Sequence, residues 1–314
     1  IKEALTQNRP YDEMVHELLT AEGPAHRRGN GATGLLARDR GMPEDSMSNT
    51  VRAFLGTRLE CAQCHDHPFD RWSRSEYYRT VGFTGGIEYR SHLERTPEGQ
   101  QLRRWSEKWI DKEGQAAKKA LAKLLQPLDA GISGGGSGAV RLPRDYQYSD
   151  AEPDAWVVAR TLFGDPVSIQ PKLPDESALE AKFRSSAARQ SDPDASEAKF
   201  RKKLAKLQAE DIRSRDSFAA WLTSPTNPRF TTVIVNRLWK EVMGRGLVEP
   251  ADDFKDDTTA CHPALLEHLE ALMRELDYDL RAFQAVLYNT RTWQREASFL
   301  EPQPGEPHDL RGPV

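Results

Sequence analysis

Apolar side chains recur three and four residues apart in the N-terminal third of the chain, a spacing that predicts short amphipathic helices. One helix should carry Pro10 in its first turn and an apolar stripe over residues 14–19. A second helix fits residues 45–58, and a third, shorter one should begin at Ser73 or soon after it. Residues 23–43 between the first two are rich in Gly and Arg and indicate a loop.

The last hundred residues show the same pattern more regularly. An apolar face runs from Phe230 to Val242 and stops at Gly244, a residue type that favours the left-handed conformation at a helix end. Pro263 should open the next helix, and Asp279 should cap a final one. Such helices joined by short turns are typical of a helical bundle.

The middle of the chain differs in composition. Residues 94–129 are charged and helix-prone, and residues 131–138 read Gly-Ile-Ser-Gly-Gly-Gly-Ser-Gly, which by composition indicates a flexible linker. An extended piece is expected around residues 156–162, and a second charged helix from about residue 196 to 209. We therefore predict a mainly α fold in which two helical units are joined by a charged, Gly-rich middle segment.

Composition narrows the classes of function. The formal net charge of -4 argues against a general nucleic-acid binder, which needs a concentrated basic surface. No apolar run approaches the length of a membrane span, so we predict no transmembrane segment in this chain. The chain begins at Ile1 rather than Met, which indicates a piece of a longer or processed protein.

The candidate chemistry lies directly after the second predicted helix. Cys61 and Cys64 are three residues apart, and His65 follows the second cysteine. This C-x-x-C-H spacing is typical of c-type haem attachment, with two thiols for the vinyl groups of the porphyrin and an imidazole for the iron. The sequence therefore predicts Cys61 and Cys64 as the covalent anchors of haem c and His65 as the proximal ligand. The spacing does not identify a distal ligand.

Two other interpretations of these residues stay open. Cys61, Cys64, His65 and His67 are all zinc-ligand types, and Cys261-His262 could supply a second pair for a structural zinc site. The alternative is a redox-active dithiol or a disulfide between the first two cysteines, with the histidines incidental.

Two sequence blocks carry a family resemblance. Residues 54–72, which contain the motif CAQCHDHPFD at residues 61–70, closely resemble a planctomycete cytochrome-c-like family of large secreted proteins with paired domains of unknown function. Residues 235–239 (VNRLW) and 243–250 (MGRGLVEP) resemble the partner domain of the same family. In this second block we expect Asn236 and Arg237 to form a structural lock between elements, and the acidic residues 252–257 to form a solvated turn.

The resemblance implies an extracytoplasmic c-type cytochrome-like protein, periplasmic or extracellular, that transfers electrons through one covalent haem to a redox partner protein. One alternative is a haem-dependent oxidoreductase acting on carbohydrate-related substrates, with a substrate site at the junction of the two units near residues 236–239. The other is a zinc-stabilised structural or interaction module.

These inferences divide the chain into four parts. Residues 1–93 are expected to form a partial cytochrome-c-like haem-binding helical domain, and residues 94–212 a charged helical and Gly-rich connecting region. Residues 213–300 should form a C-terminal helical domain, followed by a Pro-rich tail at residues 301–314.

Overall fold

The computed structural model describes the chain except for residues 40–41, 90–96, 165, 168, 178–208 and 296–314. About 49% of the structure is helical and about 5% is strand. The longer helices are α2 (Tyr11–Thr20), α4 (Pro43–Leu55), α5 (Arg74–Val81), α6 (Pro97–Asp129), α9 (Ser214–Leu222), α10 (Phe230–Met243), α11 (Pro263–Glu275) and α12 (Leu280–Tyr288). Shorter helical pieces are α1 (Lys2–Thr6), η1 (Gly31–Thr33), α3 (Gly34–Ala37), η2 (Glu60–Gln63) and η3 (Gly82–Thr84). The second charged helix and the Pro-rich tail expected from the sequence lie outside the described residues.

The N-terminal helices follow the predicted apolar stripes. Helix α4 begins at Pro43, buries Met47 and Val51, and ends where Gly56 adopts the left-handed conformation at φ 58°. Helix α5 is started by a capping box, in which the Ser73 hydroxyl and the Glu76 carboxylate each accept a backbone N–H at the helix start. Helix α2 packs against α9, so the first and last thirds of the chain already meet at this level.

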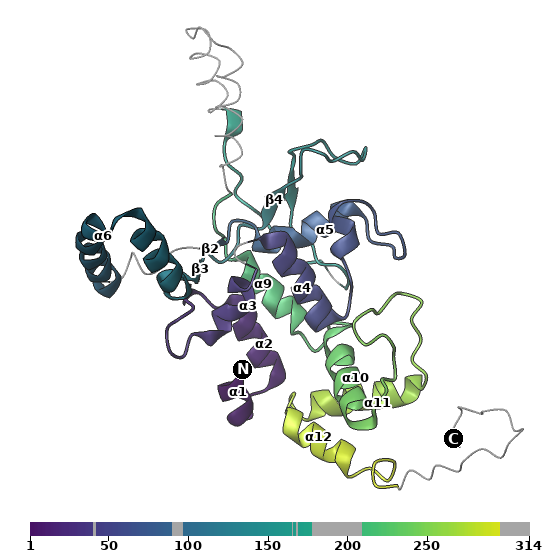
Figure 1. Cartoon of the computed structure of the whole chain (residues 1–314). Coiled ribbons are helices and arrows are strands. Elements are labelled where there is room, and N and C mark those ends of the chain that lie inside the picture. The colour runs from purple at the N-terminus through teal and green to yellow at the C-terminus, as the bar shows by residue number, and fades with distance from the viewer. Residues whose placement is uncertain (40–41, 90–96, 165, 168, 178–208, 296–314) are drawn as a thin grey trace, which may run out of the picture.

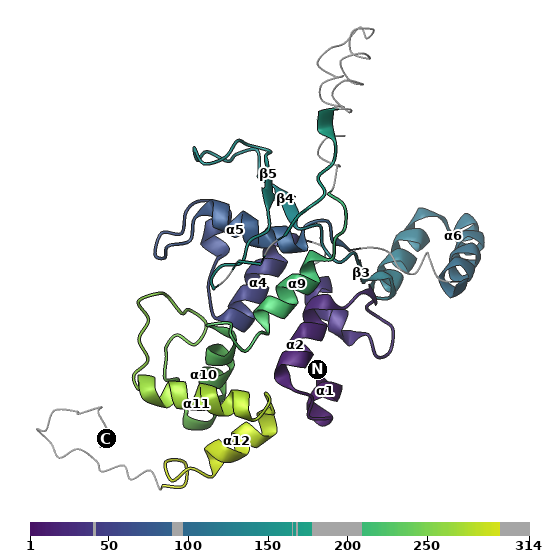
Figure 2. The same ribbon diagram turned by 180° about the vertical axis from the view of Figure 1, so that it is seen from behind.

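The C-terminal helices also match their sequence signals. Helix α10 ends at Gly244, which is left-handed with φ 83°, and α12 is capped by the Asp279 carboxylate. Helix α10 contacts α11, α12 and α4. Figures 1 and 2 show α10, α11 and α12 together at one end of the molecule, with α6 standing off to the side.

Two small antiparallel sheets complete the fold. Strands β1 (Gly23–Pro24), β3 (Gly131–Ser133) and β2 (Glu88–Tyr89) form one sheet in the order β1-β3-β2, with Ile132 opposite Gly23 and Tyr89. Strands β4 (Ala139–Arg141) and β5 (Trp156–Val158) form the other, with Val140 opposite Val157. Strand β5 corresponds to the extended piece expected around residues 156–162.

The prediction of a mainly α fold with a Gly-rich connecting linker is wrong. Residues 131–138 contribute strand β3 and then run through the interior, where Gly135, Gly136 and Gly138 are buried. Their backbone holds three distant segments, because Ser137 N donates to Gly85 O (2.7 Å), Ala159 N to Gly138 O (2.8 Å) and Arg215 N to Gly135 O (2.8 Å).

Close backbone approach explains why this segment is rich in glycine. At Gly136, with φ +94°, an added Cβ would lie 2.2 Å from the carbonyl oxygen of Phe83. Glycine is needed here for a positive φ and for the absence of a side chain, not for flexibility. Composition alone does not separate these two uses.

A single hydrophobic core replaces the two predicted helical units. It runs from Tyr11 in α2 to Leu287 in α12. Tyr11 stacks on Phe230 at a centroid distance of 5.2 Å, and Phe83 packs on Phe218 at 5.1 Å. Of the described helices, none combines the length and the apolar character needed to cross a lipid bilayer.

Candidate functional site

The C-x-x-C-H motif forms an exposed turn held from below by two apolar side chains. Leu59 and Ala62 are buried in the core, so they anchor the helix η2 on one side. Cys61, Cys64 and His65 lie on the exposed side. The turn is closed by long hydrogen bonds of 3.4 Å from the backbone N–H groups of Cys64 and His65 to the carbonyl of Cys61. The structure therefore brings all three predicted side chains to one stretch of surface.

The chemical state of these side chains suits ligand binding. Cys61 and Cys64 are both free thiols, as is Cys261. The Nδ1 atom of His65 lies 2.8 Å from the carbonyl oxygen of Asp66. A carbonyl only accepts hydrogen bonds, so Nδ1 is the donor, and in the neutral imidazole Nε2 is then the nitrogen with the lone pair. A metal-binding histidine is usually oriented by a hydrogen bond from the ring nitrogen that does not bind the metal.

A buried arginine that sequence analysis missed supports the turn. Arg74 is nearly fully buried, and its Nε donates to the carbonyl of Gln63 at 3.0 Å while its guanidinium pairs with Asp145 at 2.8 Å. Its backbone N–H donates to the Asp66 carboxylate at 2.8 Å. Within a polar helix start, no sequence signal separated this arginine from an exposed one.

The loop after the motif is fixed by its own polar groups. His67 N donates to the carbonyl of Trp72 at 2.8 Å, and the His67 Nδ1 accepts the backbone N–H of Phe69 at 3.2 Å. The indole N–H of Trp72 donates to Asp70 at 3.1 Å. His67 therefore closes the loop with one of its ring nitrogens.

The described residues do not assemble a zinc site. Across the described part of the chain, no three His, Cys, Asp or Glu side chains are grouped so that they could hold a metal ion. Cys261 and His262 remain a separate exposed pair at the start of α11, where Cys261 N donates to the carbonyl of Leu247 at 2.8 Å.

The donor set fits a c-type haem, whereas the surrounding apolar residues are mostly used elsewhere. Two free thiols and an imidazole with an available Nε2 are the groups that attachment requires. Phe69 is the large apolar side chain exposed beside the motif, at 77%. The other large apolar side chains that are near the motif in sequence lie in the core: Phe54, Leu55, Leu59, Trp72, Tyr77 and Tyr78.

Two methionines and two histidines near the motif in sequence are of types that could serve as a distal haem ligand, and their surroundings differ. Met47 is buried in the core, whereas Met42 is half exposed beside the β1-β3-β2 sheet, where it shares a small cavity with Ile132. His26 is exposed, and His92 lies outside the described residues.

An acidic loop from the C-terminal third forms ion pairs with arginines on both sides of the motif. Asp252 pairs with Arg52 at 2.7 Å and with Arg58 at 2.8 Å, three residues before Cys61. Asp256 pairs with Arg71, six residues after His65, at 2.7 Å. Burial opposes ionisation of Asp252, but the hydrogen bonds from the two arginines outweigh it and lower the pKa of this carboxyl group. The acidic loop is therefore solvated, as expected, and it also holds the segment that carries the motif; we call Asp252 and Asp256 with their arginine partners the clamp.

Backbone and apolar contacts reinforce this clamp. Phe254 N donates to the carbonyl of Gly56 at 2.7 Å, and the buried Phe254 ring covers the glycine. An added Cβ at Gly56 would lie 2.7 Å from the Phe254 ring and 2.8 Å from Val233.

The structural lock predicted for Asn236 and Arg237 is confirmed. The buried Asn236 amide donates to the carbonyl of Val248 and accepts its N–H, both at 2.9 Å. Arg237 donates to the carbonyls of Arg52 and Ala53 in the last turn of α4. Both side chains are committed to holding the helices, so they do not present a free surface to a substrate.

Comparison with known proteins identifies two families of unknown function. Residues 1–89 match the model of PSCyt2, described as a protein of unknown function (DUF1549), and residues 214–307 match PSD1, described as a protein of unknown function (DUF1553). This pair agrees with the paired-domain organisation that the sequence blocks indicated. No curated protein and no solved structure matches the chain.

Proposed function

We propose that this chain is a c-type cytochrome-like protein that carries one covalent haem on Cys61 and Cys64, with His65 as the proximal ligand. The observation that supports it best is the exposed turn on which two free thiols and an imidazole with an available Nε2 lie together. When bound, a haem supplies one-electron redox chemistry at this surface.

The chain's own residues would hold and orient the group. The thiols of Cys61 and Cys64 each provide one sulfur for a thioether bond, and the carbonyl of Asp66 keeps the His65 ring in the tautomer that ligates through Nε2. Arg74 and Tyr78 bond the carbonyl of Gln63, which fixes the turn between the two cysteines.

The exposure of the motif favours electron exchange with a redox partner protein that docks on this face. Attachment of haem c takes place outside the cytoplasm, so we also propose a periplasmic or extracellular location. The name PSCyt2 of the matching family is in keeping with a cytochrome-like relation.

The test is the pyridine haemochrome spectrum of the chain produced together with a haem-attachment machinery. We expect a haem band that survives acid-acetone extraction in the wild type. Cys64→Ala should lower the yield of covalent haem strongly, and the double variant Cys61→Ala/Cys64→Ala should abolish it. Cys261→Ala is the matched control, because it removes an equally exposed free thiol outside the motif and should retain full haem.

Two outcomes would contradict the proposal. Full covalent haem in the double variant would place attachment elsewhere. Wild-type protein without covalent haem, but with one zinc per chain by elemental analysis, would support the zinc-stabilised module.

A further inference from the structure

A basic cavity lies beside the motif and is not explained by haem attachment. It has a volume of about 230 Å³ and lies between the start of α5 and the loop that follows β5. Its lining includes Arg71, Glu76, Arg79, Arg160, Thr161 and Phe163. Sites for drug-sized ligands begin at about 300 Å³, so this cavity suits one small molecule.

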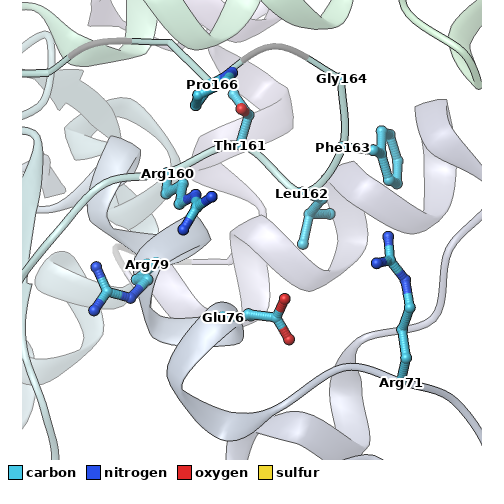
Figure 3. A pocket seen from close by; sticks show the side chains of 9 residues that line it. All are labelled: Arg71, Glu76, Arg79, Arg160, Thr161, Leu162, Phe163, Gly164 and Pro166. Carbon is cyan, nitrogen blue, oxygen red and sulfur yellow. The ribbon is translucent and has the colours of Figure 1, made fainter. Parts of the chain in front are cut away.

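The cavity presents charged groups that do not neutralise one another. Figure 3 shows the Arg160 guanidinium and the Glu76 carboxylate facing the same space, with Leu162 beside them. Arg160 has no side-chain hydrogen bond or ion pair in the described part of the chain, whereas Arg79 interacts with Asp150 and points away from the space between Arg160 and Glu76. Glu76 binds the Ser73 hydroxyl and N–H through one oxygen, at 3.0 and 2.9 Å, which leaves its other oxygen toward the cavity.

The remaining lining adds an aromatic face. Arg71 rises toward the Phe163 ring from the opposite side and is balanced by its ion pair with Asp256. The Thr161 hydroxyl is buried and has no hydrogen-bond partner among the described residues. This hydroxyl is turned toward Pro166 and is itself covered, so a molecule in the cavity does not reach it.

We propose that this cavity binds a small hydroxy-carboxylate, such as a single sugar acid. A guanidinium such as that of Arg160 recognises a carboxylate through charge-assisted hydrogen bonds. The free oxygen of Glu76 accepts a hydrogen bond from a hydroxyl, and the Phe163 ring covers an apolar face of the ligand. Arg160 offers an unpaired guanidinium for one carboxylate, and Glu76 opposite it disfavours a second negative charge, so the cavity matches a monoanion better than a phosphate dianion.

The first test compares ligands on the wild-type chain by isothermal titration calorimetry. D-glucuronate should bind at one site, and D-glucose, which lacks the carboxylate, should show no saturable binding. Inorganic phosphate and glycine should each bind at least about tenfold more weakly than glucuronate. Phosphate or glycine binding as tightly as glucuronate would overturn the proposal in favour of a general oxyanion site or an amino-acid site.

Variants then locate the site. Arg160→Met removes an exposed charge and should weaken glucuronate binding about tenfold or more. Arg104→Met is the matched control, because Arg104 is an exposed arginine on α6 outside the cavity, and it should bind as the wild type does. Equal affinity of both variants would refute the site.

Glu76→Gln separates the two ways in which this carboxylate could act. Glutamine keeps the capping box and still accepts a hydrogen bond from a hydroxyl, so glucuronate affinity should fall less than tenfold. A ligand that carries an ammonium group would instead lose its ion pair with Glu76 in this variant. A loss of glucuronate affinity of about tenfold or more would therefore contradict a hydrogen bond from a ligand hydroxyl to Glu76. None of these measurements depends on haem, so the cavity and the proposed function can fail separately.

Discussion

Adding a single methyl group at Gly56 tests how tightly the end of α4 packs against Phe254 and Val233 of the C-terminal third. It has φ +58°, and an added Cβ would lie 2.7 Å from the Phe254 ring and 2.8 Å from Val233. Forcing alanine into the left-handed conformation costs about 1–2 kcal/mol. Overpacking against two buried side chains adds about 1–3 kcal/mol. We therefore expect Gly56→Ala to lower the free energy of unfolding by about 2–5 kcal/mol.

Gly244→Ala isolates the backbone part of this cost. Gly244 is also a left-handed glycine after a helix, with φ +83°, but no atom lies within 4 Å of its added Cβ. Its replacement should cost only about 1–2 kcal/mol. The assay is urea unfolding of both variants followed by far-ultraviolet circular dichroism. The difference between them measures how firmly Phe254 and Val233 are seated against the residue that leads into the motif.

A double-mutant cycle identifies the side chain responsible. In the background Phe254→Ala, the methyl group at position 56 gains room, so Gly56→Ala should cost less than it does in the wild type. Equal costs of Gly56→Ala and Gly244→Ala, or no coupling between positions 56 and 254, would show that Gly56 is not packed tightly against Phe254 and Val233.

Two further predictions concern the clamp and the glycine segment. Because ion pairing lowers the folded-state pKa of Asp252 below its ordinary value of about 3.9, its stabilisation is complete above that value and is lost as the pH falls through the lowered pKa. Asp252→Asn should cost about 1–2 kcal/mol at pH 7 and flatten the acid side of the stability curve, whereas parallel curves for variant and wild type would contradict this. Gly136→Ala should lower the free energy of unfolding by about 3 kcal/mol or more, since its Cβ would lie 2.2 Å from a carbonyl oxygen. Gly29→Ala is the control, because Gly29 has a positive φ and open space around an added Cβ, and it should cost only about 1–2 kcal/mol. Equal thermal midpoints for the two variants would mean that Gly136 is not closely packed, as in a flexible linker.

The sequence predicted the helices well because their signals are local. The apolar stripes of α2 and α4 and the glycine after α10 each depend on residues within a few positions of one another. The capping box at Ser73 likewise needs only a spacing of three residues. These features are therefore available without knowing the fold.

Long-range contacts were outside the reach of the same reasoning. The Gly-rich residues 131–138 indicated a linker, but the carbonyl of Phe83 and the backbone of Arg213 make glycine necessary there. Arg74 similarly looked like an ordinary helix-start arginine, and only the fold brings Gln63 and Asp145 to it. In each case the deciding partner is remote in sequence.

In the candidate site, too, the local features were predictable from the sequence and the long-range contacts were not. The spacing of Cys61, Cys64 and His65 identified which groups would share a surface, and the structure places them on one exposed turn. The acidic loop was expected to be a solvated turn, because nothing local pairs Asp252 with Arg58 about 190 residues away.

The clamp gives the two matching families a physical connection. The residues around the motif belong to the part that matches one family, and Asp252, Phe254 and Asp256 belong to the part that matches the other. Arg58 and Arg71 flank the motif on either side, and each is paired with a carboxylate of that second part. A displacement of the acidic loop would therefore free both ends of the segment that carries Cys61, Cys64 and His65. The C-terminal part is in this way a support for the motif, and the motif's geometry is a property of the two parts together.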